Sequence, residues 1–281
     1  MSKGRTLEDA RDAFAGLPPP VVVFNKSHSG SRLLARLLES SGIWMGERLN
    51  ASHDAEGLFP LVRHVVERYY PDYPELWRSG RWDDALVGLI MDVFGEHLDG
   101  RGDRPWGWKL CETVYLLPLV DYLFPEARYI HIIRDGRDVA FSDHVPPVEP
   151  LWRKIYVDSD RVVSWRGLTF GRLARIFYRL DSSRYNIQHW VNSVELGRRY
   201  GAMLGDRYHE VRYEDLCRDF DRVGREVLRF AQALDPEAGL ATIGPTVSPS
   251  SIGKFRRRNP LKVAAVTRYA RPLLTSLGYT D

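Results

Sequence analysis

A stretch of small polar residues near the start of the chain, 25–32, has the composition of an anion-binding loop. It reads Asn-Lys-Ser-His-Ser-Gly-Ser-Arg and lies between the apolar run 21–24 and a leucine-rich stripe, so it would join a buried strand to a helix. At such a junction, free backbone N–H groups and the positive end of the helix converge on an anion. The predicted anion-binding residues are Lys26, Ser27, His28, Ser29, Gly30, Ser31 and Arg32.

The order of residues in this loop differs from that of a nucleotide-hydrolysing P-loop. A Walker A loop reads G-x-x-x-x-G-K-[ST]. Here Asn25 stands at the first glycine position, and Ser31-Arg32 stand where the Lys-Ser/Thr pair is needed. The lysine that binds the terminal phosphates in a Walker A loop and the hydroxyl that binds magnesium are therefore both missing from their usual positions. The pattern therefore disfavours an NTPase and favours a simple anion loop, with an ordinary serine-capped turn as the alternative.

The second stretch with the residues for anion chemistry is 134–142, Arg-Asp-Gly-Arg-Asp-Val-Ala-Phe-Ser. Arg134 follows a β-branched run and would sit at the carboxyl end of a buried strand, where ligands bind in open α/β sheets. Ser142 would lie on the first turns of the following helix, and an arginine fork plus a hydroxyl can hold one phosphate from two sides. We interpret Asp135 and Asp138 as a helix cap and structural partners of the arginines.

The strands and helices that position these loops alternate along the chain. Continuous apolar strands separated by amphipathic helices predict an α/β fold with a parallel sheet flanked by helices. We interpret residues 145–185, where prolines precede aromatics interleaved with arginines, as a helical or loop insertion that forms a lid over the active site. The expected strands are 21–24, 106–110, 128–133 and 208–213, and the expected helices are 61–70, 84–98, 114–124, 187–204, 220–233 and 263–277.

Length and composition limit the class of protein. The 281 residues, of 32.4 kDa, fit one large domain or two small ones, and we expect a single domain, 1–281, that begins with a polar leader at 1–19. A formal charge of +3 is too small for a chain that coats nucleic acid by charge. Two cysteines cannot form a disulfide framework or a zinc site of four ligands, and we expect no metal. With no secretory signal and no long apolar run, we expect a cytoplasmic protein without a membrane span.

Together these motifs resemble the sulfotransferase family that uses 3′-phosphoadenosine 5′-phosphosulfate (PAPS). The 25–32 loop is similar to the family's signature for the 5′-phosphosulfate, and 134–142 is similar to its signature for the 3′-phosphate. The segment that begins at Tyr213 resembles one near the adenine, and 251–257 resembles a late segment that closes over the nucleotide. The resemblance implies a P-loop-like three-layer fold. The further cofactor-binding residues that it implies are Arg134, Ser142, Tyr213, Ser251, Ile252, Gly253 and Lys254.

The chain departs from the family's pattern at three places. The basic residue directly before Ser-Gly is His28, and the nearest lysine is Lys26, so both are candidates for contact with the leaving phosphate. The segment 106–109, Trp-Gly-Trp-Lys, matches a motif of bacterial relatives, but the following residues do not, so only Lys109 is carried over. Phe255 stands in place of a tryptophan in the late segment.

Sulfonyl transfer needs fixed donors at the leaving phosphate and a base for the acceptor hydroxyl. We favour His53 as the base because an unperturbed histidine pKa of about 6.5 suits proton uptake near neutrality. Glu56 and Glu112 follow as candidates, and His144 is a weaker one. The predicted catalytic set is His53, Lys26, His28, Glu56, Glu112 and Lys109.

The resemblance implies a sulfotransferase that moves the sulfonate of PAPS to a hydroxyl of a small-molecule, lipid or carbohydrate acceptor and releases adenosine 3′,5′-bisphosphate. One alternative is a P-loop kinase or nucleotide hydrolase. Another is a catalytically silent nucleotide-binding protein, suggested by the displaced lysine. Of the six lysines in the chain, Lys26, Lys109 and Lys254 fall within the motifs, which favours one compact anionic ligand over a broad polyanion surface.

Overall fold

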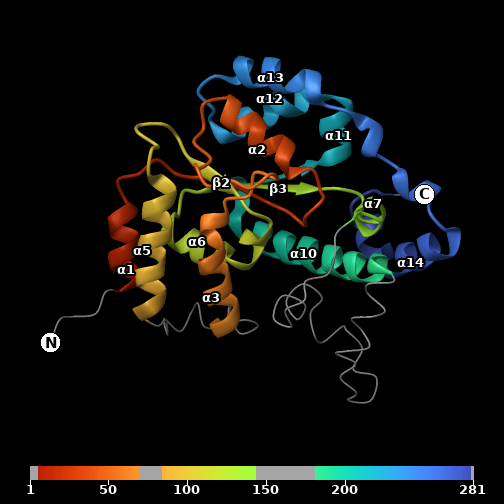
Figure 1. Ribbon diagram of the computed structural model, residues 1–281, viewed down its shortest axis with the longest axis horizontal. Coiled ribbons are helices and arrows are strands. Elements are labelled where there is room, and N and C mark those ends of the chain that lie inside the picture. The colour runs from red at the N-terminus through yellow and green to blue at the C-terminus, as the bar shows by residue number, and fades with distance from the viewer. Residues whose placement is uncertain (1–5, 70–83, 144–180, 280–281) are drawn as a thin grey trace.

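A computed structural model describes residues 6–69, 84–143 and 181–279, and Figure 1 shows them arranged around a central sheet. The sheet has four parallel strands in the order β2-β1-β3-β4. Its strands are β1 (Val21–Phe24), β2 (Gly107–Lys109), β3 (Arg128–Ile133) and β4 (Tyr208–Arg212). Because β1 lies between β2 and β3, the loops that follow these three strands meet at one edge of the sheet.

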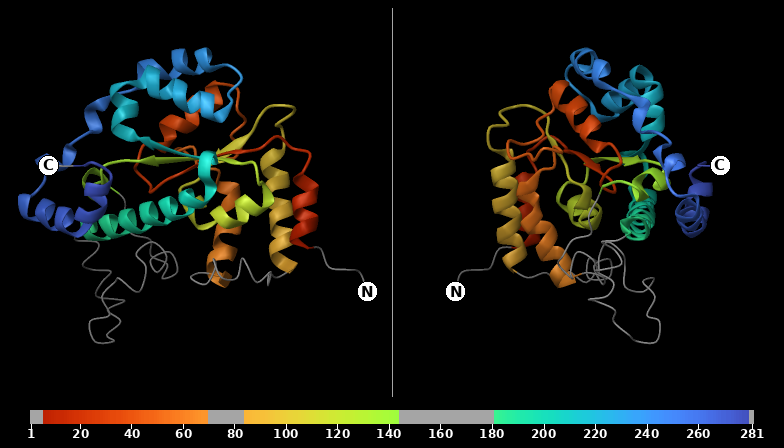
Figure 2. Two further views of the ribbon diagram at one scale, coloured as in Figure 1. Left: turned by 180° about the vertical axis from the view of Figure 1, so that it is seen from behind. Right: turned by 45° about the vertical axis from the view of Figure 1, so that its right-hand side comes forward.

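The strand β1 is buried on both sides, which explains why its sequence is continuously apolar. Val21 and Val23 belong to the core under one layer of helices, and Val22 and Phe24 belong to the core under the opposite layer. Helix layers on both faces of a parallel sheet confirm the predicted three-layer α/β fold (Figure 2).

One face of the sheet is covered by four helices, drawn above it in Figure 1. They are α2 (Ser31–Ser40), α11 (Tyr213–Arg218), α12 (Phe220–Ala231) and α13 (Pro236–Ile243). The sequence analysis missed α13, although Asp235 accepts a hydrogen bond from the Ala238 N–H as its cap and Pro236 begins the helix.

The opposite face packs against the remaining helices, which form two clusters. Those on the β2 side are α1 (Leu7–Phe14), α3 (Phe59–Tyr69), α5 (Asp84–Leu98) and α6 (Leu117–Leu123). Those on the β3 side are α7 (Gly136–Ala140), α10 (Ser182–Leu204) and α14 (Pro260–Ser276). Short 3₁₀ turns cover Glu56–Leu58, Cys111–Tyr115, Gly205–Arg207, Gly244–Thr246, Pro249–Ser251 and Lys254–Arg257.

Several boundaries differ from the sequence predictions. The expected helix 114–124 is divided into a 3₁₀ turn and α6, because Pro118 lacks an N–H group and starts a new helix. Part of the expected polar leader folds as α1, where Thr6 caps the helix and its apolar side packs into the core. Of the expected lid, 145–180 lie outside the described residues, and the rest caps and begins α10.

None of the helices that the structure describes is both long enough and apolar enough to cross a membrane.

Candidate active site

The loop after β1 turns sharply before it enters α2. His28 and Gly30 both have left-handed backbone angles, with φ of 70° and 90°. A Cβ added at Gly30 would lie 2.2 Å from Cδ2 of Tyr213, so only glycine allows this close approach. Gly30 caps α2 without a side chain, and the first turn of α2 holds no acidic residue. The N–H groups at this helix end therefore remain available to an anion.

Lys26 is buried within the loop, with 1% of its surface exposed. Its Nζ donates to the Ser27 carbonyl at 3.3 Å and to the Ser27 hydroxyl at 3.2 Å. Burial lowers the pKa of Lys26 to about 8, and the negative charge of Glu112 acts in the opposite direction. Lys26 is thus a partly desolvated cation at the end of β1, although it lies two residues before the family position.

His28, at the family position, lies at the surface of the loop. Partial desolvation is the main cause that lowers the pKa of its imidazole, followed by the positive charges of Lys26 and Arg134. Its backbone carbonyl, rather than its ring, makes the contact that joins this loop to β3.

Lys109 ends β2 and is buried in an ion pair. Its Nζ lies 2.6 Å from Oδ1 of Asp54 and donates to the Ser52 carbonyl at 2.7 Å. The other oxygen of Asp54 accepts a hydrogen bond from the Asn50 amide at 3.1 Å. The lysine therefore holds the loop after α2 against the sheet. The sequence analysis singled out Lys109 but missed Asp54, because nothing local marks a partner 55 residues away.

Cys111 connects this ion pair to the first loop. Its thiol donates to the Asn25 side-chain carbonyl at 3.4 Å and faces Oδ1 of Asp54 at 3.8 Å. Burial raises the pKa of the Cys111 thiol far above its usual range, so the sulfur stays protonated. Asn25 also donates to the Lys26 carbonyl. Asn25, at the first glycine position of a Walker loop, thus ties the two loops together.

The three predicted bases occupy different surroundings. The Nδ1 of His53 lies 3.7 Å from the carboxylate of Glu39 in the last turn of α2, and burial lowers the pKa of the imidazole. Glu56 is exposed at the start of a 3₁₀ turn. Glu112 follows β2, and its charge raises the pKa values of both Lys26 and the neighbouring thiol.

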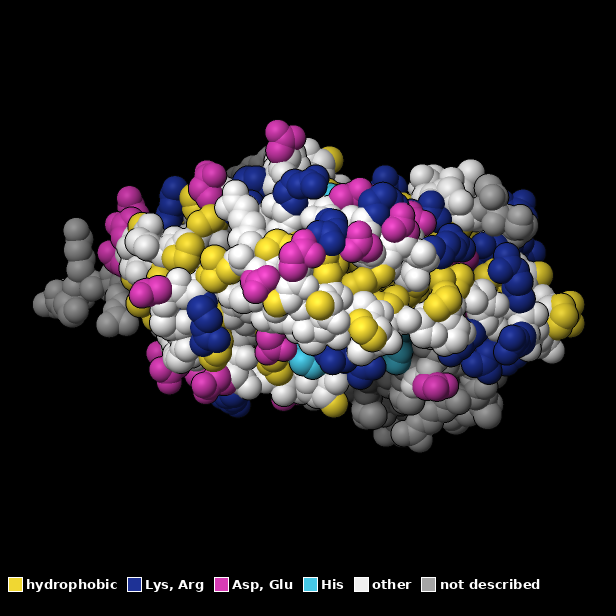
Figure 3. All heavy atoms as spheres, turned by 90° about the horizontal axis from the view of Figure 1, so that it is seen from above, with side chains coloured by type: hydrophobic (Ala, Val, Ile, Leu, Met, Phe, Trp, Pro, Cys, Tyr) yellow, Lys and Arg dark blue, Asp and Glu magenta, His cyan; other side chains and the backbone are white. Residues whose placement is uncertain are grey.

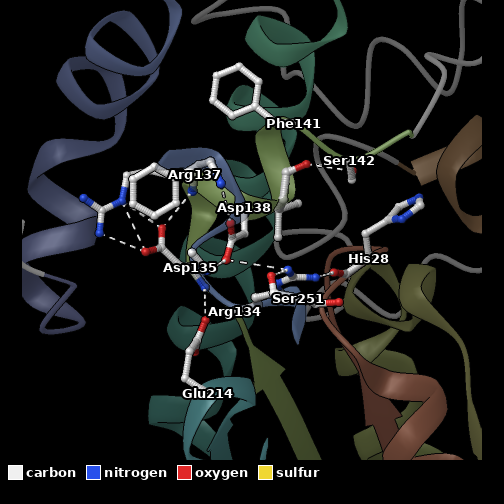
Figure 4. Close-up of polar contacts among 12 residues, drawn as sticks. His28, Arg134, Asp135, Arg137, Asp138, Phe141, Ser142, Glu214 and Ser251 are labelled. Atoms are coloured by element: carbon white, nitrogen blue, oxygen red, sulfur yellow. Dashed lines mark hydrogen bonds and ion pairs between the residues drawn. The ribbon is translucent and has the colours of Figure 1, made fainter. Parts of the chain in front are cut away.

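Arg134 links three parts of the site that are distant in sequence (Figure 4). Its Nη1 donates to the His28 carbonyl at 3.2 Å, and its Nη2 donates to the Ser251 carbonyl. Its guanidinium lies 4.8 Å from the centre of the Tyr213 ring. The Trp190 indole donates to the Arg134 carbonyl at 3.0 Å and fixes the backbone at the end of β3.

The two aspartates after Arg134 have structural roles, as predicted. Asp135 accepts a hydrogen bond from the Arg137 N–H at 2.9 Å and pairs with its guanidinium at 2.8 Å. Asp138 lies 3.6 Å from Arg134 and accepts hydrogen bonds from late-segment N–H groups. Ser142 follows α7, and its hydroxyl donates to the Val139 carbonyl at 2.7 Å.

Residues of the two weaker motifs also lie at this end of β3. Tyr213 covers Gly30, and burial raises the pKa of its phenol to about 12. Its neighbour Glu214 is structural, because its carboxylate accepts hydrogen bonds from the Asp135 N–H at 2.9 Å and the Tyr279 hydroxyl at 2.8 Å. Gly253 has a φ of 74°.

In the late segment, Phe255 is buried and packs 4.4 Å from the Arg137 guanidinium, in the place of the family's tryptophan. Ser251, Ile252 and Gly253 are partly buried, and Lys254 is exposed. Figure 3 shows Lys and Arg side chains gathered at the end of the molecule where Figure 1 places α14 and the C-terminus.

The structure therefore brings together the first loop, Arg134, Tyr213 and the late segment. His53 lies beside this group, where the positive charge of Arg32 at the end of the first loop acts on its imidazole. Glu56 is exposed, and His144 lies outside the described residues. In the described ranges, no group of three or more His, Cys, Asp or Glu side chains could hold a metal ion.

Comparisons with known proteins find sulfotransferases. Residues 19–235 match the model of a family described as the sulfotransferase family. Carbohydrate sulfotransferase 3 from Homo sapiens is 27% identical over 241 residues, which are 78% of this chain and 46% of that protein. The chain thus spans about half the length of this curated relative.

Solved structures share the fold at low sequence identity. The sulfotransferase domain from the curacin biosynthetic pathway has a TM-score of 0.53 and 18% identity, over 91% of this chain and 98% of its own. The sulfotransferase domain of the Synechococcus PCC 7002 olefin synthase has a TM-score of 0.51 and 18% identity, over 90% and 94% of the two chains. A sulfotransferase from Mycobacterium tuberculosis H37Rv has a TM-score of 0.50 and 12% identity, over 93% and 80%.

Proposed function

The chain belongs to the sulfotransferase family, and we propose that it transfers the sulfonate group of PAPS to a hydroxyl of a small-molecule, lipid or carbohydrate acceptor. The observation that carries this proposal is the position of Arg134, whose guanidinium contacts both the first loop and the late segment. An anion-binding loop and an arginine at neighbouring strand ends suit a nucleotide with phosphates at both its 5′ and 3′ positions.

The residues present fit such a ligand. The N-terminus of α2, with Lys26, would hold the 5′-phosphosulfate, and Arg134 with Ser142 would hold the 3′-phosphate. The Nε of Arg134 is buried and has no hydrogen-bond partner among the described residues, so this guanidinium retains an unused donor. Tyr213 would lie near the adenine. We propose that Ser251, Ile252, Gly253 and Lys254 complete the nucleotide site.

Sulfonyl transfer requires little covalent chemistry from the protein itself. Bound PAPS supplies the activated sulfonate, and the residues of this chain position it and stabilise the charge that grows on the leaving phosphate. Lys26 is mostly protonated at neutral pH, because its pKa is about 8, and it lies at the loop. We therefore propose Lys26, rather than the His28 ring, as the cationic donor. Lys109 acts as a positioning residue through Asp54.

The acceptor hydroxyl must lose a proton to a base near the reacting atoms. We propose Glu112 for this role, ahead of His53 and Glu56. Its charge acts directly on Lys26, whereas His53 pairs with Glu39 on the last turn of α2. The similarity to a carbohydrate sulfotransferase favours sugar hydroxyls as the first acceptors to test.

Calorimetry and a transfer assay test the proposal against its alternatives. In calorimetry the protein should bind adenosine 3′,5′-bisphosphate tightly and ADP with magnesium weakly. With PAPS that carries a labelled sulfonate, the protein should transfer the label to an acceptor. A preference for ADP with magnesium would support a P-loop kinase or hydrolase. Binding of the bisphosphate without transfer to any acceptor tested would support a silent nucleotide-binding protein.

A further inference from the structure

The carboxylate of Asp138 is completely buried between α7 and the late segment, 251–257. Its Oδ2 accepts a hydrogen bond from the Gly253 N–H at 2.7 Å, and its Oδ1 accepts one from the Phe255 N–H at 2.9 Å. A carboxylate that accepts backbone N–H groups with both oxygens forms strong, charge-assisted hydrogen bonds. Asp138 therefore fixes two alternate residues of a segment that lies more than a hundred positions later in the chain.

The late segment has little regular structure of its own. It runs from the last residue of the 3₁₀ turn Pro249–Ser251, through Gly253 in a left-handed conformation, to the end of the 3₁₀ turn Lys254–Arg257. Such short turns provide few internal hydrogen bonds. The conformation of the segment therefore depends on its contacts with other elements, and Asp138 makes two of them.

Asp138 and Arg134 contact different parts of the late segment. Arg134 donates to the Ser251 carbonyl at the start of the segment, and Asp138 accepts from N–H groups farther along. The two side chains face each other at 3.6 Å, so the same carboxylate also orients the guanidinium. A substitution of either residue would therefore alter the orientation of the other side chain through this ion pair.

We propose that Asp138 is a positioning residue for the nucleotide. It holds the late segment and the Arg134 guanidinium in the arrangement that binds the bisphosphate, and it does so without contact with the nucleotide. The proposal rests on the proposed function, because it assumes that the late segment closes over PAPS. It adds a role for the second acidic residue of the 134–142 stretch, whose charge would otherwise oppose an anionic ligand.

The test uses Asp138→Asn in the full chain. The amide keeps the size of the side chain but leaves one carbonyl for two N–H donors. Hydrogen–deuterium exchange should become faster in peptides that cover 251–258 and stay unchanged in β3. Affinity for adenosine 3′,5′-bisphosphate should fall roughly tenfold or more, the usual cost of a buried donor without a partner. The KM for PAPS should rise more than kcat falls.

A matched control is Asp235→Asn, which makes the same change at the cap of α13. It should leave both the exchange of 251–258 and the bisphosphate affinity unchanged. If Asp138→Asn does not fold, Gly253→Ala perturbs the same segment from its other side, because φ is 74° and a Cβ would lie 2.8 Å from Arg256. It should give the same pattern of faster exchange and weaker binding.

The outcomes separate this proposal from the proposed function. Unchanged exchange at 251–258 in Asp138→Asn would show that Asp138 does not hold the late segment. Faster exchange with undiminished bisphosphate affinity would overturn the link to nucleotide binding. A wild-type protein that does not bind the bisphosphate would instead refute the proposed function, while the exchange measurement would still test whether Asp138 holds the segment.

Discussion

The guanidinium of Arg134 donates a hydrogen bond to the backbone carbonyl of His28 at 3.2 Å. This contact joins the two stretches that carry the anion chemistry, which are 106 residues apart in sequence. It is possible because β1 and β3 are parallel neighbours, so the residues that follow them emerge at the same edge of the sheet. Arg134 therefore has a structural role in addition to its proposed role as a ligand of the 3′-phosphate.

Replacement of Arg134 separates these roles. Arg134→Ala should weaken binding of adenosine 3′,5′-bisphosphate by about tenfold to a hundredfold, because charge-assisted hydrogen bonds to a phosphate contribute about 1.5–3 kcal/mol. Binding of AMP, which has no 3′-phosphate, should change much less. Calorimetry with both nucleotides measures the difference. An equal loss for the two nucleotides would show that Arg134 acts only through the structure of the loops.

Lys26 should show a conflict between stability and activity. Burial lowers its pKa to about 8, below its ordinary value of 10.5, so the folded state disfavours the charged form. Its contribution to stability is present above pH 10.5 and is lost as the pH falls through about 8. At neutral pH, Lys26→Met should therefore raise the midpoint of thermal unfolding of the unliganded protein.

The same substitution should lower kcat by about 10²–10³, as expected for loss of a donor to the leaving group. In the wild type, kcat/KM should decline as the pH rises through about 8, because Lys26 then loses its proton. His28→Ala is the control and should keep most of the activity. The reverse order, with His28→Ala more damaging than Lys26→Met, would assign the donor role to His28.

The fold was predictable because its signals are local. The apolar run of β1 and the residues around Arg134 identify a strand end and the following helix without reference to any other part of the chain. The ion pair of Lys109 with Asp54 was not predictable, because it depends on how a loop 55 residues away lies against the sheet. The role of His53 as the base stays a prediction: the sequence offered a histidine with a suitable ordinary pKa, and the structure adds its Glu39 partner.

The base can be identified by comparing three variants. Glu112→Gln should lower kcat by about 10²–10⁴, the usual contribution of a general base, with little change in bisphosphate affinity. His53→Ala and Glu56→Gln should retain nearly full turnover, because the His53 ring pairs with Glu39 and the Glu56 side chain is exposed to solvent. Steady-state kinetics with PAPS and a sugar acceptor measure this. Loss of turnover in His53→Ala alone would return the role to the histidine.

Glu214 should make the stability of the protein depend on pH. Its buried carboxylate accepts hydrogen bonds from the Asp135 N–H and the Tyr279 hydroxyl, and burial raises its pKa above the ordinary value of 4.5. The folded state thus holds the proton to a higher pH than the unfolded state does. The resulting stabilisation is present below pH 4.5 and is lost as the pH rises through the pKa of the folded state.

Glu214→Gln removes this titration and keeps the shape of the side chain. Its carbonyl can accept from the Asp135 N–H, and its amide can donate to the Tyr279 oxygen. The free energy of unfolding of the variant should therefore fall less than that of the wild type as the pH rises from about 4.5 to neutrality. Denaturant titrations across that range, with Tyr279→Phe as the control that keeps the carboxylate, measure the two slopes. Identical slopes for wild type and Glu214→Gln would mean that Glu214 titrates alike in both states and that its burial does not oppose its charge.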